Sequence, residues 1–428
     1  MNRWATLTKS LRDERPVLVV FQQPAKAGAE AKVESQSRRL FFHPAGVACL
    51  AVSDILSRIK AAARELGFDV VGIASVEPLH ADDAHYRRWL DSGFAAGMDY
   101  MTRRPDLFAS PGRLVPDAQS LITLAVNYYA SAPEFQHQNR YGRVARYAWG
   151  LDYHEVVKPR LARLAARIED LAGRKVHARC FVDAVPLLER AVAESAGLGF
   201  VGKNTNLLQP RSGSWFFLAE ILVDLELAPD TKRISVSCGS CRRCIEACPT
   251  GAFAEEYVLD SRRCISYLTI ENKGEIPREL RDGVGEWLFG CDVCQDVCPF
   301  NRFASDTDWP HLRPEAGTGQ KLDLVEVLSI SNDAEFRARF GGTALSRPKR
   351  RGLLRNAAVV AANVECTSTV PLLADRVGRD PEALIRAHAL WALGRLDFSR
   401  ARRLAERLRL DDPEQLVRNE ALAVLSDE

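Results

Sequence analysis

The stretch that decides the fold is Cys238-Gly239-Ser240-Cys241-Arg242-Arg243-Cys244-Ile245-Glu246-Ala247-Cys248-Pro249. Its four cysteines follow the spacing C-x2-C-x2-C-x3-C-P, in which bacterial ferredoxins bind one [4Fe–4S] cluster and give the fourth thiolate to a second cluster. A partner set follows at Cys264, Cys291, Cys294 and Cys298, and the last of these again precedes a proline. The two sets together predict a domain built around two iron–sulfur clusters.

Exchange of the fourth ligand uses all eight of these cysteines. One predicted cluster is bound by Cys238, Cys241, Cys244 and Cys298. The other predicted cluster is bound by Cys264, Cys291, Cys294 and Cys248. Zinc is a weaker alternative, because a structural zinc ion takes four ligands, usually as two short pairs, and would leave Cys241 and Cys244 surplus. Disulfides are weaker still. Cys49, Cys180 and Cys366 lie outside any ligand spacing, and we expect them to be small core residues.

Composition is that of an ordinary multidomain soluble protein. The chain has 428 residues, of which 46% are hydrophobic and 27% are charged, with a net charge of +2. Nucleic-acid binding would therefore have to depend on local charge. No apolar run approaches the roughly 20 residues of a membrane helix, and cluster-bound thiolates need a reducing compartment. We expect a cytoplasmic protein without a membrane association.

We predict an α+β multidomain chain. Its expected parts are an N-terminal extension (1–52), a catalytic α/β domain (53–230), a ferredoxin-like double-cluster domain (231–305), a linker (306–344) and a helical domain (345–428). In the extension, Arg38-Arg39 faintly resembles a twin-arginine export signal, but His43 and Pro44 interrupt the apolar region that follows. We therefore expect an extension that is dispensable or disordered.

The catalytic domain is expected to mix helices and strands. Apolar spacing predicts helices near 53–66, 161–171 and 186–197, and strands near 68–74, 120–129, 177–183 and 215–227. Gly67 and Gly173 are typical residues to end a helix. The run Gly197-x-Gly199-x-x-Gly202 follows a helix and not a strand, so we reject a dinucleotide site there.

The C-terminal tail contains an internal repeat. Similar segments begin at Arg355, Arg386 and Arg418, at an interval of about 31 residues that predicts HEAT-like helix pairs. Equivalent arginines would place a row of positive charge along one face, although a solvated charged face is the usual alternative. The residues predicted to contact nucleic-acid phosphates are Arg347, Lys349, Arg350, Arg351, Arg355, Arg386 and Arg418.

Several motifs, in order, resemble those of epoxyqueuosine reductases, which are cobalamin-dependent iron–sulfur enzymes of queuosine biosynthesis in tRNA. The runs that carry the resemblance are 146–154, 183–190, 197–205, the first cysteine run, 264–271 and 290–301. The resemblance covers about residues 54–428, and the N-terminal extension has no counterpart in it. It implies a cobalamin domain of flavin-reductase-like fold, a double-cluster ferredoxin domain and a HEAT-like region.

The resemblance also implies an activity. Members of this family reduce epoxyqueuosine to queuosine at the tRNA wobble position and expel the epoxide oxygen as water. Electrons would pass from an external low-potential donor through two [4Fe–4S] clusters to cobalamin, and we expect the protein to be a monomer. One alternative is a corrinoid reductive dehalogenase of small organohalides, which would have no use for a basic tail. Another is a ferredoxin-like electron carrier with a protein-binding solenoid.

Asp183 is the predicted proton donor. It ends a strand after Phe181-Val182, and desolvation would favour its neutral form. The alternative is that Asp183 caps the helix that begins near Pro186. The residues expected to contact cobalamin are Arg146, Tyr147, Asp183, Lys203, Asn204, Thr205, Ser214 and Trp215. Trp215 is as well explained as a core residue, Tyr153 as packing, and His154 is a weak candidate for a cobalt ligand.

Overall fold

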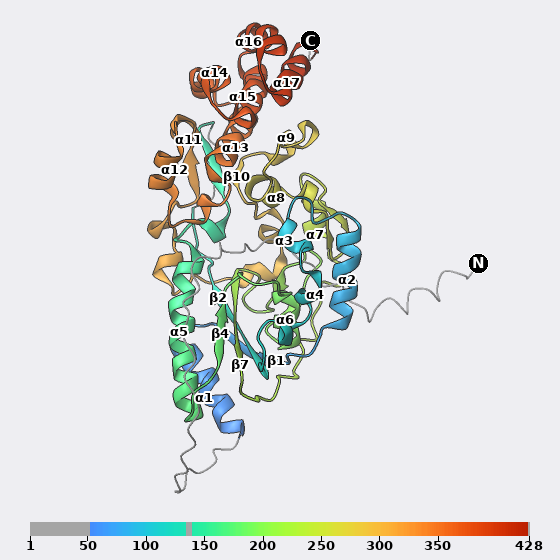
Figure 1. The fold of residues 1–428 in the computed structure, drawn as a ribbon, viewed down its shortest axis with the longest axis vertical. Helices are drawn as coiled ribbons and strands as arrows, with labels where there is room; N and C mark the ends of the chain where they lie inside the picture. The colour runs from blue at the N-terminus through green and yellow to red at the C-terminus, as the bar shows by residue number, and fades with distance from the viewer. Residues whose placement is uncertain (1–51, 134–138, 427–428) are drawn as a thin grey trace, which may run out of the picture.

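The computed structural model describes residues 52–133 and 139–426. Figure 1 shows a sheet with its covering helices at one end, short elements in the middle and the helices of the C-terminal tail at the other end. The predicted extension, including Arg38 and Arg39, lies outside the described residues except for Val52. Within the described ranges, no helix is long and apolar enough to cross a membrane.

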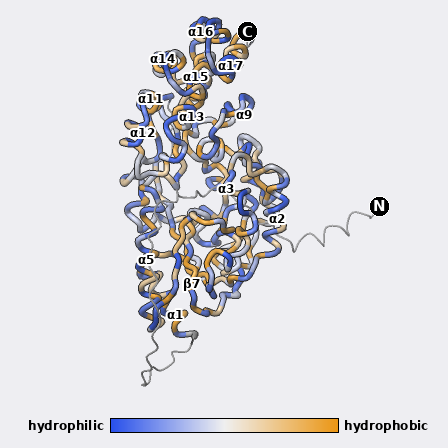
Figure 2. Tube along the Cα trace, viewed as in Figure 1, coloured by the Kyte–Doolittle hydropathy of each residue, from blue (hydrophilic) through white to orange (hydrophobic). Residues whose placement is uncertain are grey.

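A four-stranded antiparallel sheet forms the centre of the first part, in the order β1-β2-β7-β4. Its strands are β1 (Val70–Ala74), β2 (Ser120–Asn127), β7 (Phe216–Val223) and β4 (Ala178–Phe181). The two central strands, β2 and β7, are almost wholly buried, because helices cover both faces of the sheet. Figure 2 shows hydrophobic residues along these strands. The antiparallel pairing agrees with the predicted α+β class. It differs from the mostly parallel sheet of a doubly wound nucleotide-binding fold.

Helices α1 (Val52–Glu65) and α5 (Tyr153–Ala172) pack on one face of this sheet. Leu161, Leu164 and Ile168 of α5 are fully buried there. The helix ends as predicted at Gly173, which adopts the left-handed conformation at φ 64°. The opposite face is covered by α6 (Glu189–Ser195), which runs into the short hairpin of β5 (Phe200–Val201) and β6 (Leu207–Leu208).

A second sheet joins three distant parts of the chain. Strand β3 (Tyr141–Val144) pairs in parallel with β10 (Trp287–Phe289) and antiparallel with β11 (Lys321–Asp323). The predicted catalytic domain, the cluster region and the segment 306–344 are therefore connected by one sheet. Three short helices, α2 (His80–Asp91), α3 (Asp99–Thr102) and α4 (Pro105–Phe108), pack beside the cluster region.

The segment 306–344 is not the linker that we predicted. It contains β11 and the helices α11 (Leu324–Ser329) and α12 (Asp333–Phe340), and its apolar side chains join the core of the cluster region. Trp309 is buried, and its indole N–H donates to the Gly67 carbonyl at 2.8 Å. Side chains of this segment are buried in the core under the sheet and in the core shared with the C-terminal helices, so the segment is an integral part of the fold.

The cluster region consists of short elements separated by the cysteine loops. These elements are α7 (Arg243–Glu246), β8 (Phe253–Glu255), β9 (Val258–Leu259), α8 (Ile265–Ile270), α9 (Arg278–Val284) and α10 (Val293–Asp296). They are too short to bury a large core alone. One contiguous hydrophobic core instead continues from this region into the C-terminal helices.

The tail consists of five helices: α13 (Lys349–Asn363), α14 (Val370–Arg379), α15 (Ala383–Leu396), α16 (Phe398–Asp411) and α17 (Gln415–Ser426). Helices α13 and α15 are buried on nearly all sides, whereas α14 and α16 lie outside them. This alternation is the arrangement that the predicted helix pairs require, and their assignment to the HEAT-like class stays a prediction.

Candidate active site and cluster pockets

The eight cysteines divide between two pockets as the spacing predicts. Cys238, Cys241, Cys244 and Cys298 line a pocket of about 360 Å³, which we call the first cluster pocket. Cys248, Cys264, Cys291 and Cys294 line one end of a larger cavity of about 1200 Å³. Sulfurs from separate loops thus converge on two spaces, and this donor set fits two iron–sulfur clusters.

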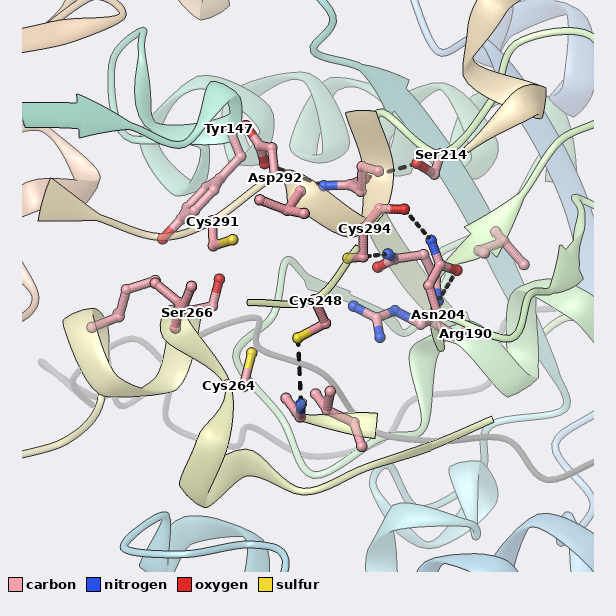
Figure 3. A pocket seen from close by; sticks show the side chains of 18 of the residues that line it. Tyr147, Arg190, Asn204, Ser214, Cys248, Cys264, Ser266, Cys291, Asp292 and Cys294 are labelled. Carbon is pink, nitrogen blue, oxygen red and sulfur yellow. Dashed lines mark hydrogen bonds between the residues drawn. The ribbon is translucent and has the colours of Figure 1, made fainter. Parts of the chain in front are cut away.

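The larger cavity lies between the sheet domain and the cluster region. Tyr128, Tyr153 and Phe217 form its wall on the sheet side, and Tyr147 lies near the second set of cysteines. Figure 3 shows those four cysteines facing the same space as Tyr147 and Asn204. Residues of both the sheet domain and the cluster region line this cavity, so a group bound there would contact both.

Asp183 is one hydrogen bond away from this cavity. Strand β4 ends two residues earlier, and Asp183 takes the left-handed conformation at φ 51° with 9% of its surface exposed. The Tyr153 hydroxyl, which lies at the cavity wall, donates to Asp183 Oδ2 at 2.6 Å. The cap interpretation is wrong, because α6 begins after Leu188 and has no side-chain cap.

The protonation of Asp183 is governed by its burial. Desolvation raises the pKa of its carboxyl well above the usual range, and the nearby charge of Glu189 raises this pKa further. The hydrogen bond from Tyr153 and the charges of Arg190 and Arg347 lower the same pKa by smaller amounts. A neutral carboxyl beside a cavity is a source of one proton.

Three of the other predicted cofactor contacts, Tyr147, Asn204 and Ser214, line the cavity. The Ser214 hydroxyl donates to Gln295 Oε1 at 2.8 Å, which connects the start of β7 to the second cysteine run. The Asn204 amide donates to the Cys294 carbonyl at 3.2 Å, and Asn204 also lines the first cluster pocket. It therefore lies between the two sets of cysteines.

Lys203 belongs to the first cluster pocket and not to the cavity. Its ammonium donates to the Gly239 carbonyl at 2.7 Å and pairs with Glu256 at 2.9 Å, and its backbone N–H points to Cys238 Sγ at 3.5 Å. Thr205 is fully buried, and its carbonyl accepts from the Arg190 guanidinium at 2.9 Å. The prediction for Lys203 is corrected here, because its ammonium is engaged within the protein, whereas the Thr205 hydroxyl has no partner among the described residues and its cofactor contact stays a prediction.

Arg146 and Trp215 lie outside the residues that line the cavity. The Arg146 guanidinium stacks on Trp149 and Trp215 at 4.5 and 4.7 Å and donates to the Ala130 carbonyl. Trp215 has 2% of its surface exposed and is a core residue, which is the second of its two predicted roles. His154 bonds through Nδ1 to Asp152 at 2.7 Å and stacks on Tyr153, so it too is a packing residue.

Two of the seven predicted phosphate contacts are interior residues. The fully buried Arg355 donates to the carbonyls of Leu268, Asn272 and Gly274, and thereby connects α13 to the cluster region. Arg350 has 3% of its surface exposed and pairs with Asp380. A guanidinium that satisfies buried acceptors cannot also meet a phosphate, so these two predictions are wrong.

The repeated arginines of the later helices have a similar structural role. Arg386 makes two hydrogen bonds to the Asp412 carboxylate, at 2.9 and 2.8 Å. Arg418 donates to the Asp412 backbone carbonyl and to Gln415. The repeat is therefore a ladder of arginines that joins successive helix pairs, and a row of free positive charge along one face is not observed for these residues.

The other three predicted phosphate contacts lie together where α13 meets the cluster region. Arg347 makes two hydrogen bonds to Glu271, at 3.0 and 3.1 Å, and its charge acts on Asp183. Lys349 is exposed at the first residue of α13, and Arg351 donates to the carbonyl of the exposed Lys273. We call Lys273, Lys349 and Arg351 the basic corner.

Sequence reasoning misses the surroundings of Asp183. It interprets Tyr153 as packing and gives no role to Glu189, Arg190 or Glu220. One signal is present in the chain: Glu220 is the single acidic residue within the apolar strand Phe216–Val223. A charged side chain in a strand that is buried on both faces costs free energy unless it is paired or neutralised.

An α+β domain and a double-cluster domain that share one cavity, with a buried acid at its wall, define an iron–sulfur redox enzyme. A family model described as "4Fe-4S double cluster binding domain" matches residues 237–301. Another, described as "Epoxyqueuosine reductase QueG, DUF1730", matches residues 109–184.

Relatives match most of the chain. The epoxyqueuosine reductase of Pseudomonas aeruginosa is 43% identical over 346 residues, which cover 79% of this chain and 93% of that protein. That of Xanthomonas campestris pv. campestris is 41% identical over 347 residues, which cover 80% and 96%. A crystal structure of an epoxyqueuosine reductase with an epoxyqueuosine-modified tRNA-Tyr stem loop matches with a TM-score of 0.81 at 29% identity, covering 88% of this chain and 99% of that one. The chain belongs to the epoxyqueuosine reductase family and is an oxidoreductase.

Proposed function

We propose that this protein reduces epoxyqueuosine to queuosine at the wobble position of tRNA and releases the epoxide oxygen as water. The observation that carries this proposal is the shared cavity. Tyr153 lines this cavity, and its hydroxyl donates a hydrogen bond to Asp183. Cys248, Cys264 and two further cysteines line the same cavity. A proton donor and an electron source thus converge on one space, and the reaction consumes both.

Cobalamin is the cofactor that we propose for the remaining space. Tyrosine and phenylalanine side chains line part of the cavity, and Tyr147, Asn204 and Ser214 would contact the ring or its amides. When bound, cobalamin would supply low-potential chemistry that no side chain provides.

The two pockets suggest a direction for the electrons. The second set of cysteines lines the cavity itself, whereas Cys238 and Cys241 of the first set also line an open hollow at the surface with Arg242 and Arg243. We propose that an external low-potential donor reduces the first cluster and that the second cluster serves the cavity. Asn204 lies between the two sets and contacts both pockets.

The proposed acid is Asp183. Opening an epoxide leaves an oxygen that must be protonated, and a positioned acid contributes about 10²–10⁴ in rate. Burial keeps the carboxyl neutral near physiological pH, and Tyr153 fixes its orientation. The proton would leave Asp183 toward the epoxide oxygen, and the carboxylate that remains would be stabilised by Tyr153, Arg190 and Arg347.

The tRNA is proposed to approach over the basic corner. Lys349 and Lys273 are exposed there, and Arg351 joins them through its hydrogen bond to the Lys273 carbonyl. The adjacent Arg347 is paired with Glu271, and its charge reaches Asp183. Phosphates bound at this corner would bring an anticodon loop to the region of the acid.

The decisive experiment uses anaerobically purified holoenzyme, reconstituted with iron, sulfide and cobalamin, and tRNA that contains epoxyqueuosine. With a strong reductant, mass analysis of the nucleosides should show queuosine. Asp183→Asn should retain both cofactors and lose about 10²-fold or more in turnover, whereas the exposed Asp170→Asn should behave as wild type. If wild-type enzyme that contains all its cofactors leaves epoxyqueuosine unchanged, the proposed function is wrong.

A further inference from the structure

Three carboxyl groups converge on the side of the sheet that faces α6. Asp183 follows β4, Glu189 begins α6, and Glu220 lies in the middle of β7 between Thr123 and Phe181 of the neighbouring strands. Glu220 is fully buried, and neither of its carboxylate oxygens accepts a hydrogen bond from a donor in the part of the chain that the structure describes. A buried carboxyl group that accepts no hydrogen bond needs another polar contact, for example one in which its own proton is donated.

The partner of Glu220 is the carboxyl of Glu189. The two side chains interact directly, and 8% of the Glu189 surface is exposed. Two carboxylates in such contact cannot both be ionised, and they titrate as one unit. Burial raises the pKa of Glu189 to about 7 and that of Glu220 well above its usual range. The pair therefore keeps at least one proton, and carries at most one negative charge, near neutral pH.

Glu189 also holds the backbone of Asp183. Its Oε1 accepts the Asp183 backbone N–H at 3.1 Å and so secures a residue with φ 51°, where an L-residue is strained. Tyr153, Arg190 and Arg347 favour the ionised form of Asp183. The negative charge of Glu189 acts in the opposite direction. Glu220, Tyr100 and Tyr147 also interact electrostatically with the Asp183 carboxyl.

We propose that Glu189 and Glu220 form a proton-sharing pair that positions Asp183 and holds it in the protonated form in which it acts as an acid. Glu189 contacts Asp183, and Glu220 allows Glu189 to remain buried because it shares the proton and the charge. Both are positioning residues, and the proton of the pair is not consumed. The inference rests on the proposed role of Asp183 as the proton donor.

The test compares two nearly isosteric variants with opposite expected effects on the alkaline limb of kcat/KM against pH. In Glu189→Gln the amide oxygen still accepts the Asp183 N–H, but the negative charge moves away to Glu220. This limb should shift to lower pH by about one unit.

In Glu220→Gln the amide donates to Glu189, which then carries the whole charge, so the alkaline limb should stay or move to higher pH. Equal shifts, or no shift in Glu189→Gln, would overturn the proposal.

A second readout is independent of turnover. Infrared difference spectra at neutral pH between Asp183→Asn and Asp183→Asn/Glu220→Gln holoproteins should show the loss of one neutral-carboxyl band. Its absence would show that the pair holds no proton. If wild-type holoenzyme leaves epoxyqueuosine unchanged and the band is present, the proposed function fails and the pair stands. If tRNA is reduced and the band is absent, the pair fails and the proposed function stands.

Discussion

Asp183 combines three features that are costly to a folded chain and useful to an acid. It is nearly buried, it adopts a left-handed backbone, and its carboxyl is held by Tyr153. Residues that break the local rules of stability are typical of functional sites. The same aspartate in an N-cap would have stabilised α6, and the structure shows that it does not serve that purpose.

Asp183 should make the stability of the protein depend on pH. Because its pKa is raised in the folded state, the native protein binds the proton more tightly than the unfolded chain does. Its contribution to the free energy of unfolding should therefore fall as the pH rises above about 4, the pKa of an unfolded aspartate. Asp183→Asn removes this penalty.

We accordingly expect Asp183→Asn to gain stability over wild type as the pH rises from about 4 to 7. Urea unfolding of the two proteins at matched pH values measures the difference. The exposed Asp170→Asn should show no such trend. A difference between wild type and Asp183→Asn that is constant over this range would contradict the raised pKa.

At the scale of elements, arginines of the inner helices connect successive helix pairs. The repeated Arg386 of α15 pairs with Asp412 before α17, and Arg350 of α13, which is outside the repeat, pairs with Asp380 before α15. Each arginine thus connects one inner helix to the loop that precedes the next. A sequence repeat identifies equivalent positions, but it does not reveal whether they face water or protein.

Arg350→Ala should destabilise the protein, by up to about 3–5 kcal/mol, because the buried Asp380 carboxylate then keeps only the more distant Arg376, at 3.4 Å, as a cationic partner in the described part of the chain. Its matched control is Arg379→Ala, whose pair with Asp375 is exposed at 3.1 Å and should contribute little. Urea unfolding measures both. If both variants lose the same small amount, the ladder is not a structural element.

Cys264 tests the assignment of the clusters. It lies on the loop before α8, remote in sequence from the cysteines with which it lines the cavity. Cys264→Ser should therefore lose roughly half of the iron and keep the first cluster. Iron analysis and electron paramagnetic resonance of the reduced protein measure this. Cys180→Ser, outside both sets, should keep all the iron; an undiminished iron content in Cys264→Ser would contradict the assignment.

At the scale of the whole molecule, the basic corner lies where the cluster region meets α13, and the cavity lies between the cluster region and the sheet domain. Helices α1 and α5 lie at one end of the elongated chain. A tRNA bound at the basic corner would thus be held by α13 and the cluster region together. These two parts and the segment 306–344 share one continuous core.

Replacement of Lys273, Lys349 and Arg351 by Ala should weaken tRNA binding. It should also flatten the salt dependence of binding, by about 0.7 in the log–log slope for each phosphate that the variant no longer neutralises. Filter binding over a range of salt concentrations measures the slope. The matched control is Arg58→Ala/Arg163→Ala on α1 and α5. An unchanged slope in the triple variant, or an equal decrease in the control, would remove the basic corner from the tRNA surface.

Local signals in the chain are sufficient for several features. Cysteine spacing predicts the two ligand sets, because ferredoxin loops bind a cluster through neighbouring residues. Apolar periodicity predicts α5 and the long strand β7, since both bury one continuous set of side chains. The position of Asp183 after an apolar strand indicates a buried acid.

The sequence by itself therefore determined the two sets of cysteines, the main elements and the buried position of Asp183, because cysteine spacing and apolar periodicity are properties of the chain itself. Only the tertiary structure decided that Arg355 is interior, that Lys203 serves the first cluster pocket, and that β11 completes a sheet with β3. It also decided that Glu189 and Glu220 share one site with Asp183. Burial and charge pairing between distant segments set these outcomes, and no local pattern records them.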